Sequence, residues 1–180
     1  MTTASLSDVL ERADCVHSRA VIDAAIARMA AAISRDYAEG DRPLFLTLMH
    51  GGMIFAAHLA VALSIDVEFD YLHATRYRGE TSGGALRWIK PPQVTLKDRR
   101  VLLVDDILDE GKTLLAVRDY CQAAHASEVR VAVLCEKIHA RRVPGIVSDY
   151  VGVTVPDRYV FGFGMDYHEQ GRNLPAIYAL

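Results

Sequence analysis

One short apolar run in the middle of the chain is followed by three aspartates and a Gly-Lys-Thr tripeptide. The run covers residues 101–104, and the polar residues after it are Asp105, Asp106, Asp109, Glu110, Gly111, Lys112 and Thr113. A glycine turn that opens a helix presents unpaired amides and the positive end of the helix dipole to a phosphate, and the Thr113 hydroxyl adds a donor. Carboxylates suit other partners, namely the vicinal hydroxyls of a sugar or a hydrated divalent cation. The segment therefore predicts a site for a phosphate joined to a ribose.

Two familiar phosphate motifs do not describe this segment. A Walker loop ends in the same Gly-Lys-Thr but requires glycine where Asp106 stands. A dinucleotide fingerprint fails at residues 162–167, because Tyr167 replaces the third glycine and no strand-to-helix setting surrounds it. Helix capping is the simpler alternative for the acidic turn, but one Asp or Ser is enough for a cap. We therefore favour a binding site.

Alternating strand and helix patterns surround the acidic turn and must position it. Buried strands are predicted at 44–48, 67–73, 101–104 and 131–135, and helices at about 21–40, from 52 to 63, and after Gly111. This order predicts an α/β fold with a mostly parallel twisted sheet, flanked by helices on both faces. Ligands gather at the carboxyl ends of the strands in such sheets. Two stretches fall outside the sheet, a loop at about 76–86 and the segment from about Gly145 onward.

Composition limits the classes of partner. The chain has 180 residues, with 20 Lys and Arg against 23 Asp and Glu and a net charge of −3, which gives no broad attraction to nucleic acid or anionic lipid. Residues 1–10 do not resemble a signal peptide, and no run reaches the roughly 18 apolar residues of a membrane span. Cys15, Cys121 and Cys135 lack metal-site or disulfide spacing and are interpreted as buried thiols. We expect a cytoplasmic protein with no membrane and no nucleic-acid partner.

The run from Val104 to Thr113 resembles the phosphoribosyl-diphosphate motif of type I phosphoribosyltransferases, specifically the hypoxanthine-guanine type, and the resemblance spans most of the chain. It implies that Asp105 and Asp106 meet the ribose hydroxyls, that residues 109–113 wrap the 5-phosphate, and that Asp109 is the general base near purine N7. Family members often carry Thr or Ser where this chain has Glu110, and we expect the Glu110 side chain to point outward. The resemblance also implies Mg²⁺ as cofactor, with Asp105, Asp106 and Asp166 as its ligands.

Two glycine-rich segments resemble further parts of the same family. His50-Gly51-Gly52 is similar to the diphosphate-binding loop, in which lysine is more usual than His50 and a non-proline cis peptide is expected before Gly51. A tight turn is the alternative interpretation of these glycines. Residues 76–84 resemble the flexible loop that closes over the site, with Arg76 and Tyr77 in place of Ser-Tyr. Such a loop would exclude water from an oxocarbenium-like ribosyl centre, whereas a solvated hairpin tip is the plainer alternative.

Four residues resemble the purine side of the family's site. Lys137 matches the lysine that donates to the oxygen at purine position 6, which disfavours adenine because its amino group would face another donor. The resemblance implies that Tyr159 stacks on the purine, that the backbone at Val160 reads its edge, and that Asp166 faces the metal. Arg172 matches a diphosphate contact. Without the resemblance, each of these side chains is equally an ordinary surface or core residue.

The resemblance implies a purine salvage enzyme. Its reaction is the Mg²⁺-dependent transfer of the 5-phosphoribosyl group from phosphoribosyl diphosphate to hypoxanthine and/or guanine, which gives IMP or GMP and diphosphate. We expect a single domain over residues 1–180, with a core at about 18–140, a small hood at about 145–180 joined by N-terminal residues, and assembly into a dimer or tetramer. A xanthine-preferring enzyme remains an alternative. So does a non-catalytic, nucleotide-sensing regulator that binds RNA, although Arg99-Arg100 and Arg141-Arg142 are too short for a basic stripe.

Overall fold

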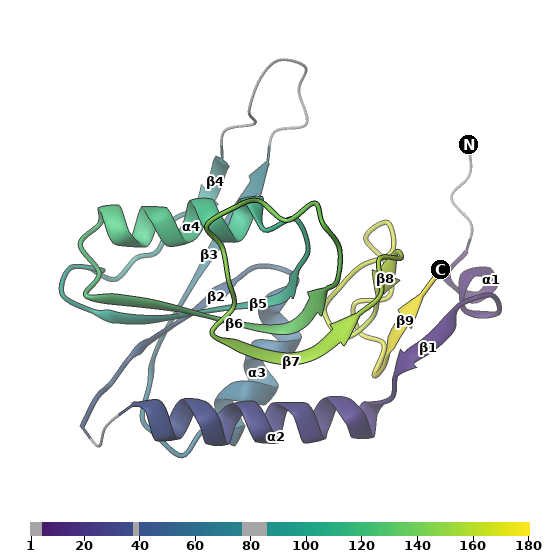
Figure 1. Cartoon of the computed structure of the whole chain (residues 1–180), viewed down its shortest axis with the longest axis horizontal. Helices are drawn as coiled ribbons and strands as arrows, with labels where there is room; N and C mark the ends of the chain where they lie inside the picture. The colour runs from purple at the N-terminus through teal and green to yellow at the C-terminus, as the bar shows by residue number, and fades with distance from the viewer. Residues whose placement is uncertain (1–4, 38–39, 77–85) are drawn as a thin grey trace.

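The protein is built on a six-stranded sheet with the strand order β4-β3-β2-β5-β6-β7. The computed structural model describes residues 5–37, 40–76 and 86–180. Five strands run parallel, and an edge strand runs antiparallel to β3 (Figure 1). The parallel strands are β2 (Leu44–Leu48), β3 (Glu68–Arg76), β5 (Arg100–Leu108), β6 (Glu128–Lys137) and β7 (Tyr150–Val155), and the edge strand is β4 (Leu86–Lys90). The α/β fold predicted from the sequence is confirmed.

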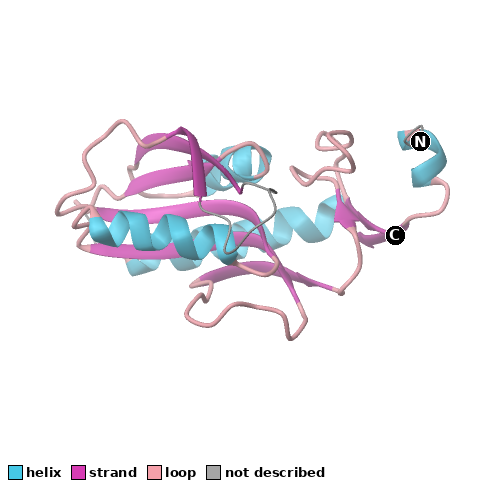
Figure 2. Cartoon of the chain, turned by 90° about the horizontal axis from the view of Figure 1, so that it is seen from above, coloured by secondary structure: helices cyan, strands magenta, loops and turns pink. Residues whose placement is uncertain are grey.

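Three helices cover the two faces of this sheet. Figure 1 shows α4 (Lys112–Ala123) above the sheet and α2 (Arg19–Asp36) below it, with α3 (Gly52–Ala62) on the same side as α2, and Figure 2 shows the layers from above. Successive side chains of a strand point to opposite faces. Leu102 and Val104 accordingly pack in the core beside α2 and α3, whereas Leu103 packs beside α4. The central strands are therefore apolar on both sides, as expected of a parallel sheet.

A smaller antiparallel sheet of three strands lies at one end of the molecule (Figure 1). Its strand order is β1 (Asp14–His17), β9 (Ile177–Ala179) and β8 (Val160–Phe161), and the short helix α1 (Leu6–Leu10) precedes it. The sequence interpretation that put everything from about Gly145 outside the main sheet is wrong for β7. This strand pairs in parallel with β6, from Ala132 beside Tyr150 to Lys137 beside Val155. The smaller sheet takes its C-terminal strands from residues beyond Val155.

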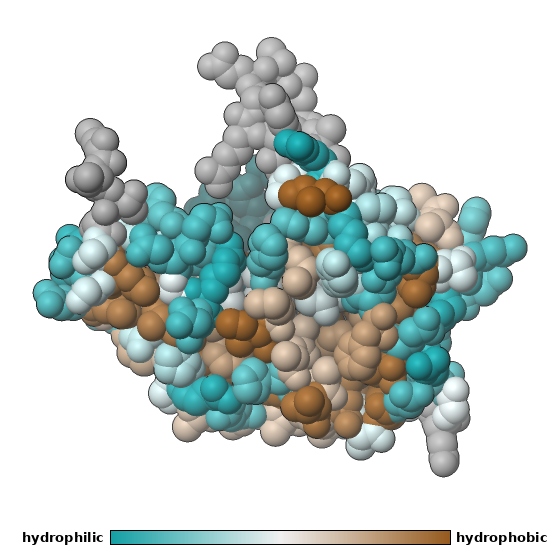
Figure 3. Space-filling model, turned by 180° about the vertical axis from the view of Figure 1, so that it is seen from behind, coloured by the Kyte–Doolittle hydropathy of each residue, from teal (hydrophilic) through white to brown (hydrophobic). Residues whose placement is uncertain are grey.

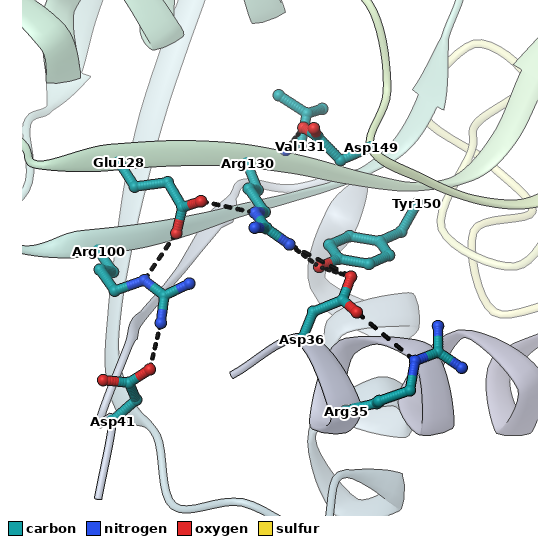
Figure 4. A network of polar contacts seen from close by, with 9 residues as sticks. All are labelled: Arg35, Asp36, Asp41, Arg100, Glu128, Arg130, Val131, Asp149 and Tyr150. Atoms are coloured by element: carbon teal, nitrogen blue, oxygen red, sulfur yellow. Dashed lines mark hydrogen bonds and ion pairs between the residues drawn. The ribbon is translucent and has the colours of Figure 1, made fainter. Parts of the chain in front are cut away.

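A polar network ties the amino ends of the strands to the end of α2 (Figure 4). Glu128 accepts from Arg100 Nε at 2.7 Å and from Arg130 Nε at 2.8 Å. Arg130 also donates to the Tyr150 hydroxyl at 2.8 Å, and that hydroxyl donates to Asp36 at 3.0 Å. Because Arg100, Glu128 and Tyr150 begin β5, β6 and β7, the network lies at the edge of the sheet opposite the acidic turn. We interpret it as structural.

The structure also tests the sequence predictions for the flexible loop, the cysteines and membrane-spanning segments. Arg76 ends β3 and pairs with Leu86 of β4, so these two ends of the expected flexible loop are strand, while Tyr77 and the rest of that loop lie outside the described residues. Cys121 and Cys135 are buried free thiols, but Cys15, in the edge strand β1, is exposed, so the expectation of a buried thiol is wrong there. No helix within the described ranges is long and apolar enough to cross a membrane.

Candidate active site

Asp105 and Asp106 are buried side by side near the carboxyl end of β5. Each residue is 8% exposed, and the Asp106 amide donates to Asp105 Oδ1 at 2.9 Å. Burial raises the pKa of Asp105 well above its usual range, and the neighbouring Asp106 raises it further. Burial likewise raises the pKa of Asp106, although hydrogen bonds and Arg172 oppose this effect. Neither carboxylate has a salt bridge among the described residues, so hydroxyl donors or a cation would suit the pair.

The turn after this pair opens a pocket at the start of α4. Gly111 precedes the helix with φ of +80°, in the left-handed region that favours glycine, and α4 has no side-chain cap. The first amides of a helix have no partner within it, so they remain available to an anion. A cavity of about 470 Å³ lies here, lined by Asp105 to Ile107 and by Asp109 to Leu114. Thr113 lines the same cavity, as a phosphate site requires.

Glu110 differs from its expected position. Its side chain is about half exposed, but it also forms a 2.5 Å ion pair with Lys112. This pair lowers the pKa of Glu110, mainly through the hydrogen bond from Lys112. The expectation that Glu110 points outward therefore holds only in part, because Lys112 is near enough to attract the carboxylate. An incoming phosphate would have to share Lys112 with Glu110 or replace it.

The loop between β2 and α3 packs directly against the acidic pair. A Cβ atom on Gly51 would lie 2.1 Å from Asp106 Oδ2, and one on Gly164 would lie 2.2 Å from the Gly51 carbonyl oxygen. Only glycine allows these close approaches. The non-proline cis peptide joins Met49 and His50, one bond earlier than expected. The exposed His50 ring lies 4.4 Å from the His73 ring, so a second histidine from β3 borders this loop.

Asp109 is held by two side chains from the end of β6 and the turn that follows it. Lys137 Nζ lies 2.6 Å from Asp109 Oδ2, and His139 Nε2 lies 2.6 Å from Oδ1. Partial burial acts to raise the pKa of Asp109, but the hydrogen bonds from Lys137 and His139 outweigh it, and the pKa is lowered. Asp109 is therefore an ionised carboxylate. Sequence reasoning missed His139, because 30 residues separate it from Asp109.

The predicted purine-side residues converge on one cavity. It has a volume of about 240 Å³ and is lined by Asp106, Ile107, Asp109, Lys137, Tyr159, Val160, Met165 and Asp166. Tyr159 is 46% exposed, so its ring is accessible to a planar ligand, whereas Val160 is buried in β8. The Tyr159 hydroxyl donates to the Asp166 carbonyl at 3.2 Å. The cavity thus combines a carboxylate, an ammonium group and an aromatic face.

Arg172 joins Asp166 on the smaller sheet's side of the site. Its guanidinium lies 2.8 Å from Asp166 and donates to the Gly164 carbonyl at 2.8 Å. In the part of the chain that the structure covers, no group of three His, Cys, Asp or Glu side chains is arranged to hold a metal ion. Asp105, Asp106 and Asp166 accordingly do not form a three-ligand metal site in this structure. Asp166 instead forms an ion pair with Arg172.

A cavity of about 480 Å³ lies elsewhere, between α3 and the strands β2 and β3. Apolar side chains, among them Phe45, Met53 and Phe69, line most of it. Its one carboxylate, Asp70, is satisfied by Lys90 and by the amides of residues 71, 93 and 94. Because the one carboxylate of this cavity already has its partners, we place the chemistry in the two polar cavities beside Asp106.

The fold and this site define a phosphoribosyltransferase. A phosphoribosyl transferase domain family matches residues 16–170, and the chain belongs to that family of enzymes. It is 36% identical over 146 residues to the hypoxanthine-guanine phosphoribosyltransferase of Streptococcus thermophilus, covering 81% of this chain and 80% of the relative. It is 31% identical over 177 residues to the hypoxanthine-guanine-xanthine phosphoribosyltransferase of Tritrichomonas foetus, covering 98% and 95%.

A solved structure agrees with these relatives. The hypoxanthine phosphoribosyltransferase of Staphylococcus aureus superposes with a TM-score of 0.89 at 26% identity and covers 98% of this chain and 96% of its own. The resemblance to the hypoxanthine-guanine type, stated from the acidic turn, is confirmed.

Proposed function

We propose that this protein transfers the 5-phosphoribosyl group of phosphoribosyl diphosphate to hypoxanthine and/or guanine, forming IMP or GMP and diphosphate. The observation that carries the proposal is the convergence of two cavities on Asp106. One is an anion pocket at the start of α4, and the other contains Asp109, Lys137 and Tyr159. A ribose bridging the two cavities would place its anomeric carbon between the phosphate and a planar base. That arrangement suits transfer of a phosphoribosyl group.

The residues of the first cavity would bind phosphate and ribose. The free amides at residues 111–113 and the Thr113 hydroxyl donate to the 5-phosphate, and Lys112 contributes charge once it exchanges Glu110 for phosphate. Asp105 and Asp106 accept from the ribose hydroxyls. His50 and Gly51 belong to the loop that approaches Asp106, where the diphosphate would lie, and Arg172, in a turn between β8 and β9, would contact it from the other side.

The residues of the second cavity would bind and deprotonate the purine. Tyr159 stacks on the ring, the Val160 backbone contacts its edge, and Lys137 donates to the oxygen at position 6. The carbon–oxygen bond to diphosphate breaks with its electron pair on the leaving group, while N9 bonds to the anomeric carbon. The N7 proton passes to Asp109, which the lowered pKa keeps ready as a base.

Mg²⁺ is the cofactor that the family resemblance implies, and the donor set fits it. Magnesium is usually held by one or two carboxylates together with substrate phosphates and waters, so a preformed protein cage is unnecessary. Asp105 and Asp106 would be the nearest carboxylates, and Asp166 would join them after Arg172 turns to the diphosphate. Bound there, the ion would neutralise charge on the diphosphate leaving group.

An ultraviolet assay tests the proposal. Purified protein, Mg²⁺ and phosphoribosyl diphosphate are mixed with hypoxanthine, guanine, xanthine or adenine separately, and each reaction is repeated with EDTA. Turnover of hypoxanthine or guanine, no turnover of adenine, and loss of activity with EDTA are expected. Faster turnover of xanthine would favour the xanthine-preferring alternative. No turnover with any base would refute the proposal, and salt-dependent retention of RNA would then favour the regulator.

We also propose that the protein is a dimer or tetramer. Phe69, Tyr71 and Met53 are 61%, 45% and 48% exposed around the apolar cavity between α3 and the strands β2 and β3. Figure 3 shows apolar residues across the lower half of the face that lies behind the plane of Figure 1. Grouped apolar side chains on a surface suit contact with another chain. Light scattering during gel filtration tests this, since a mass near the 19.9 kDa of one chain would contradict it.

A further inference from the structure

His139 is an enclosed partner of Asp109. Its side chain is 3% exposed, whereas that of Asp109 is 41% exposed. The ring makes one polar contact through each nitrogen. Nε2 lies 2.6 Å from Asp109 Oδ1, and Nδ1 lies 3.0 Å from the backbone nitrogen of Arg141. His139 is absent from the residues lining either polar cavity, so it reaches a ligand only through Asp109.

These two contacts determine which ring nitrogen carries a proton. The Arg141 amide is a donor, so Nδ1 must accept. The hydrogen therefore resides on Nε2, which donates it to Asp109 Oδ1. A ring protonated on both nitrogens would direct a second N–H at the Arg141 amide. The turn thus fixes Nε2 as the ring nitrogen that donates to Asp109.

The backbone that carries His139 is itself anchored. Arg141 forms a two-point ion pair with Asp157, at 2.7 and 2.6 Å. Arg142 donates to Glu136 at 2.6 Å and to the Lys137 carbonyl at 3.2 Å. Such planar, paired contacts restrict orientation as well as position. The backbone that carries the imidazole is therefore anchored by these ion pairs, independently of any ligand in the cavities.

Lys137 and His139 occupy different oxygens of the same carboxylate. Lys137 contacts Oδ2 through a flexible four-carbon stem, and His139 contacts Oδ1 through a rigid, enclosed ring. When Lys137 turns to the purine oxygen, Oδ2 loses its partner, but Oδ1 keeps its hydrogen bond. One oxygen of Asp109 then faces the purine while the other stays fixed.

We propose that His139 is a positioning residue, which holds Asp109 through Oδ1 so that Oδ2 is the atom that takes the purine proton. The inference rests on the proposed function, in which Asp109 is the general base. It goes further by assigning separate roles to the two oxygens and by adding a residue that touches no substrate. The hydrogen bond from His139 also helps to lower the pKa of Asp109, after the opposing effect of partial burial and together with Lys137.

Two substitutions at His139 test the role. His139→Leu removes the donor at similar size, and His139→Gln restores an N–H near the position of Nε2. We expect kcat of His139→Leu to fall about 10- to 100-fold with little change in KM for phosphoribosyl diphosphate, and the acid limb of its kcat/KM profile to move to higher pH. His139→Gln should recover most of the loss. The control is His125→Gln, because His125 is exposed in the turn before β6, at the amino edge of the sheet.

Several outcomes would overturn the proposal. A kcat of His139→Leu within threefold of wild type would do so, and so would equal losses in His139→Leu and His139→Gln. Nitrogen-15 NMR of labelled histidine gives a readout that needs no turnover and no stable leucine variant. The wild-type protein at pH 7.5 should show the His139 proton on Nε2, and a proton on Nδ1 would overturn the geometry.

The failure of this inference is distinguishable from failure of the proposed function. If wild type turns over no base, or if Asp109→Asn keeps the wild-type kcat, the general base itself is refuted and the inference falls with it. If wild type is active and Asp109→Asn is slow, while His139→Leu is as fast as wild type, only the role of His139 is refuted.

Discussion

Replacement of Gly51 by alanine should displace the Asp106 carboxylate while leaving the backbone unstrained. Gly51 has φ of −57° and ψ of −48°, a helical conformation that alanine adopts readily. The new Cβ would lie 2.1 Å from Asp106 Oδ2 and 2.6 Å from its Cγ, whereas ordinary contacts begin at 3.4 Å. The carboxylate must therefore retreat by about 1 Å, because buried side chains are close-packed.

A displacement of this size should lower the rate of the enzyme by a predictable order of magnitude. Misplacing a positioning group by about 1 Å lowers the rate of an enzyme by about 10²-fold, which corresponds to about 2.7 kcal/mol of transition-state stabilisation. We expect kcat/KM for phosphoribosyl diphosphate to fall by about this factor in the ultraviolet assay with hypoxanthine. A value within threefold of wild type would refute the reasoning, because it would mean that Asp106 can move without consequence.

Two controls separate this effect from general damage. Gly40 has φ of +88°, and no atom lies within 4 Å of the position that an added Cβ would take, so Gly40→Ala should lower stability and leave kcat/KM unchanged. In an Asp106→Ala background, Gly51→Ala should cost much less stability than in wild type, since the clashing carboxylate is gone. A double-mutant cycle by urea unfolding measures that coupling.

Three further predictions follow from the described contacts. Asp109→Asn should lower kcat by about 10²–10⁴-fold with a smaller effect on KM, and a near-wild-type kcat in the same assay would contradict its role as base. Because burial raises the pKa of Asp105, the wild-type protein loses stability as the pH rises above the ordinary carboxyl range. Asp105→Asn should therefore raise the melting temperature by about 2–4 °C at pH 8 and have little effect near pH 4, and a calorimetric gap that does not grow with pH would contradict this. Arg130→Met breaks contacts with Glu128 and Tyr150 and should lower the free energy of unfolding by about 1–2 kcal/mol while kcat is kept, as urea unfolding and the ultraviolet assay would check.

Local patterns predicted the central strands and the acidic turn well. Residues 101–104 are continuously apolar and 44–48 are apolar except for Thr47, which is typical of strands buried on both faces, and both segments lie in the middle of the parallel sheet. Asp105 and Asp106 lie within the last four residues of β5, near the carboxyl edge of the sheet, where the pattern predicted a ligand site. The resemblance then supplied the roles that spacing alone left open.

Long-range contacts were beyond these patterns. β7 pairs in parallel with β6, but the residues between the two strands do not indicate that pairing. Residues 150–155 were therefore assigned to the hood. The sequence did not single out His139, because its role depends on contact with Asp109, which lies 30 residues earlier. The pairing of Lys112 with Glu110 was likewise not predicted, because an exposed side chain has many orientations of similar energy.

The three cations assigned to substrate already have anionic partners. Lys112 is bound to Glu110, Arg172 to Asp166 and Lys137 to Asp109. In the proposed complex, each arriving group, whether a phosphate, the diphosphate or the neutral oxygen of the purine, replaces a carboxylate of the protein as the partner of one cation. The affinity measured for a ligand is the difference between two attractions, and much of each favourable contact is offset by the one it replaces. A loosely held substrate and an easily released product are the natural result of such a balance.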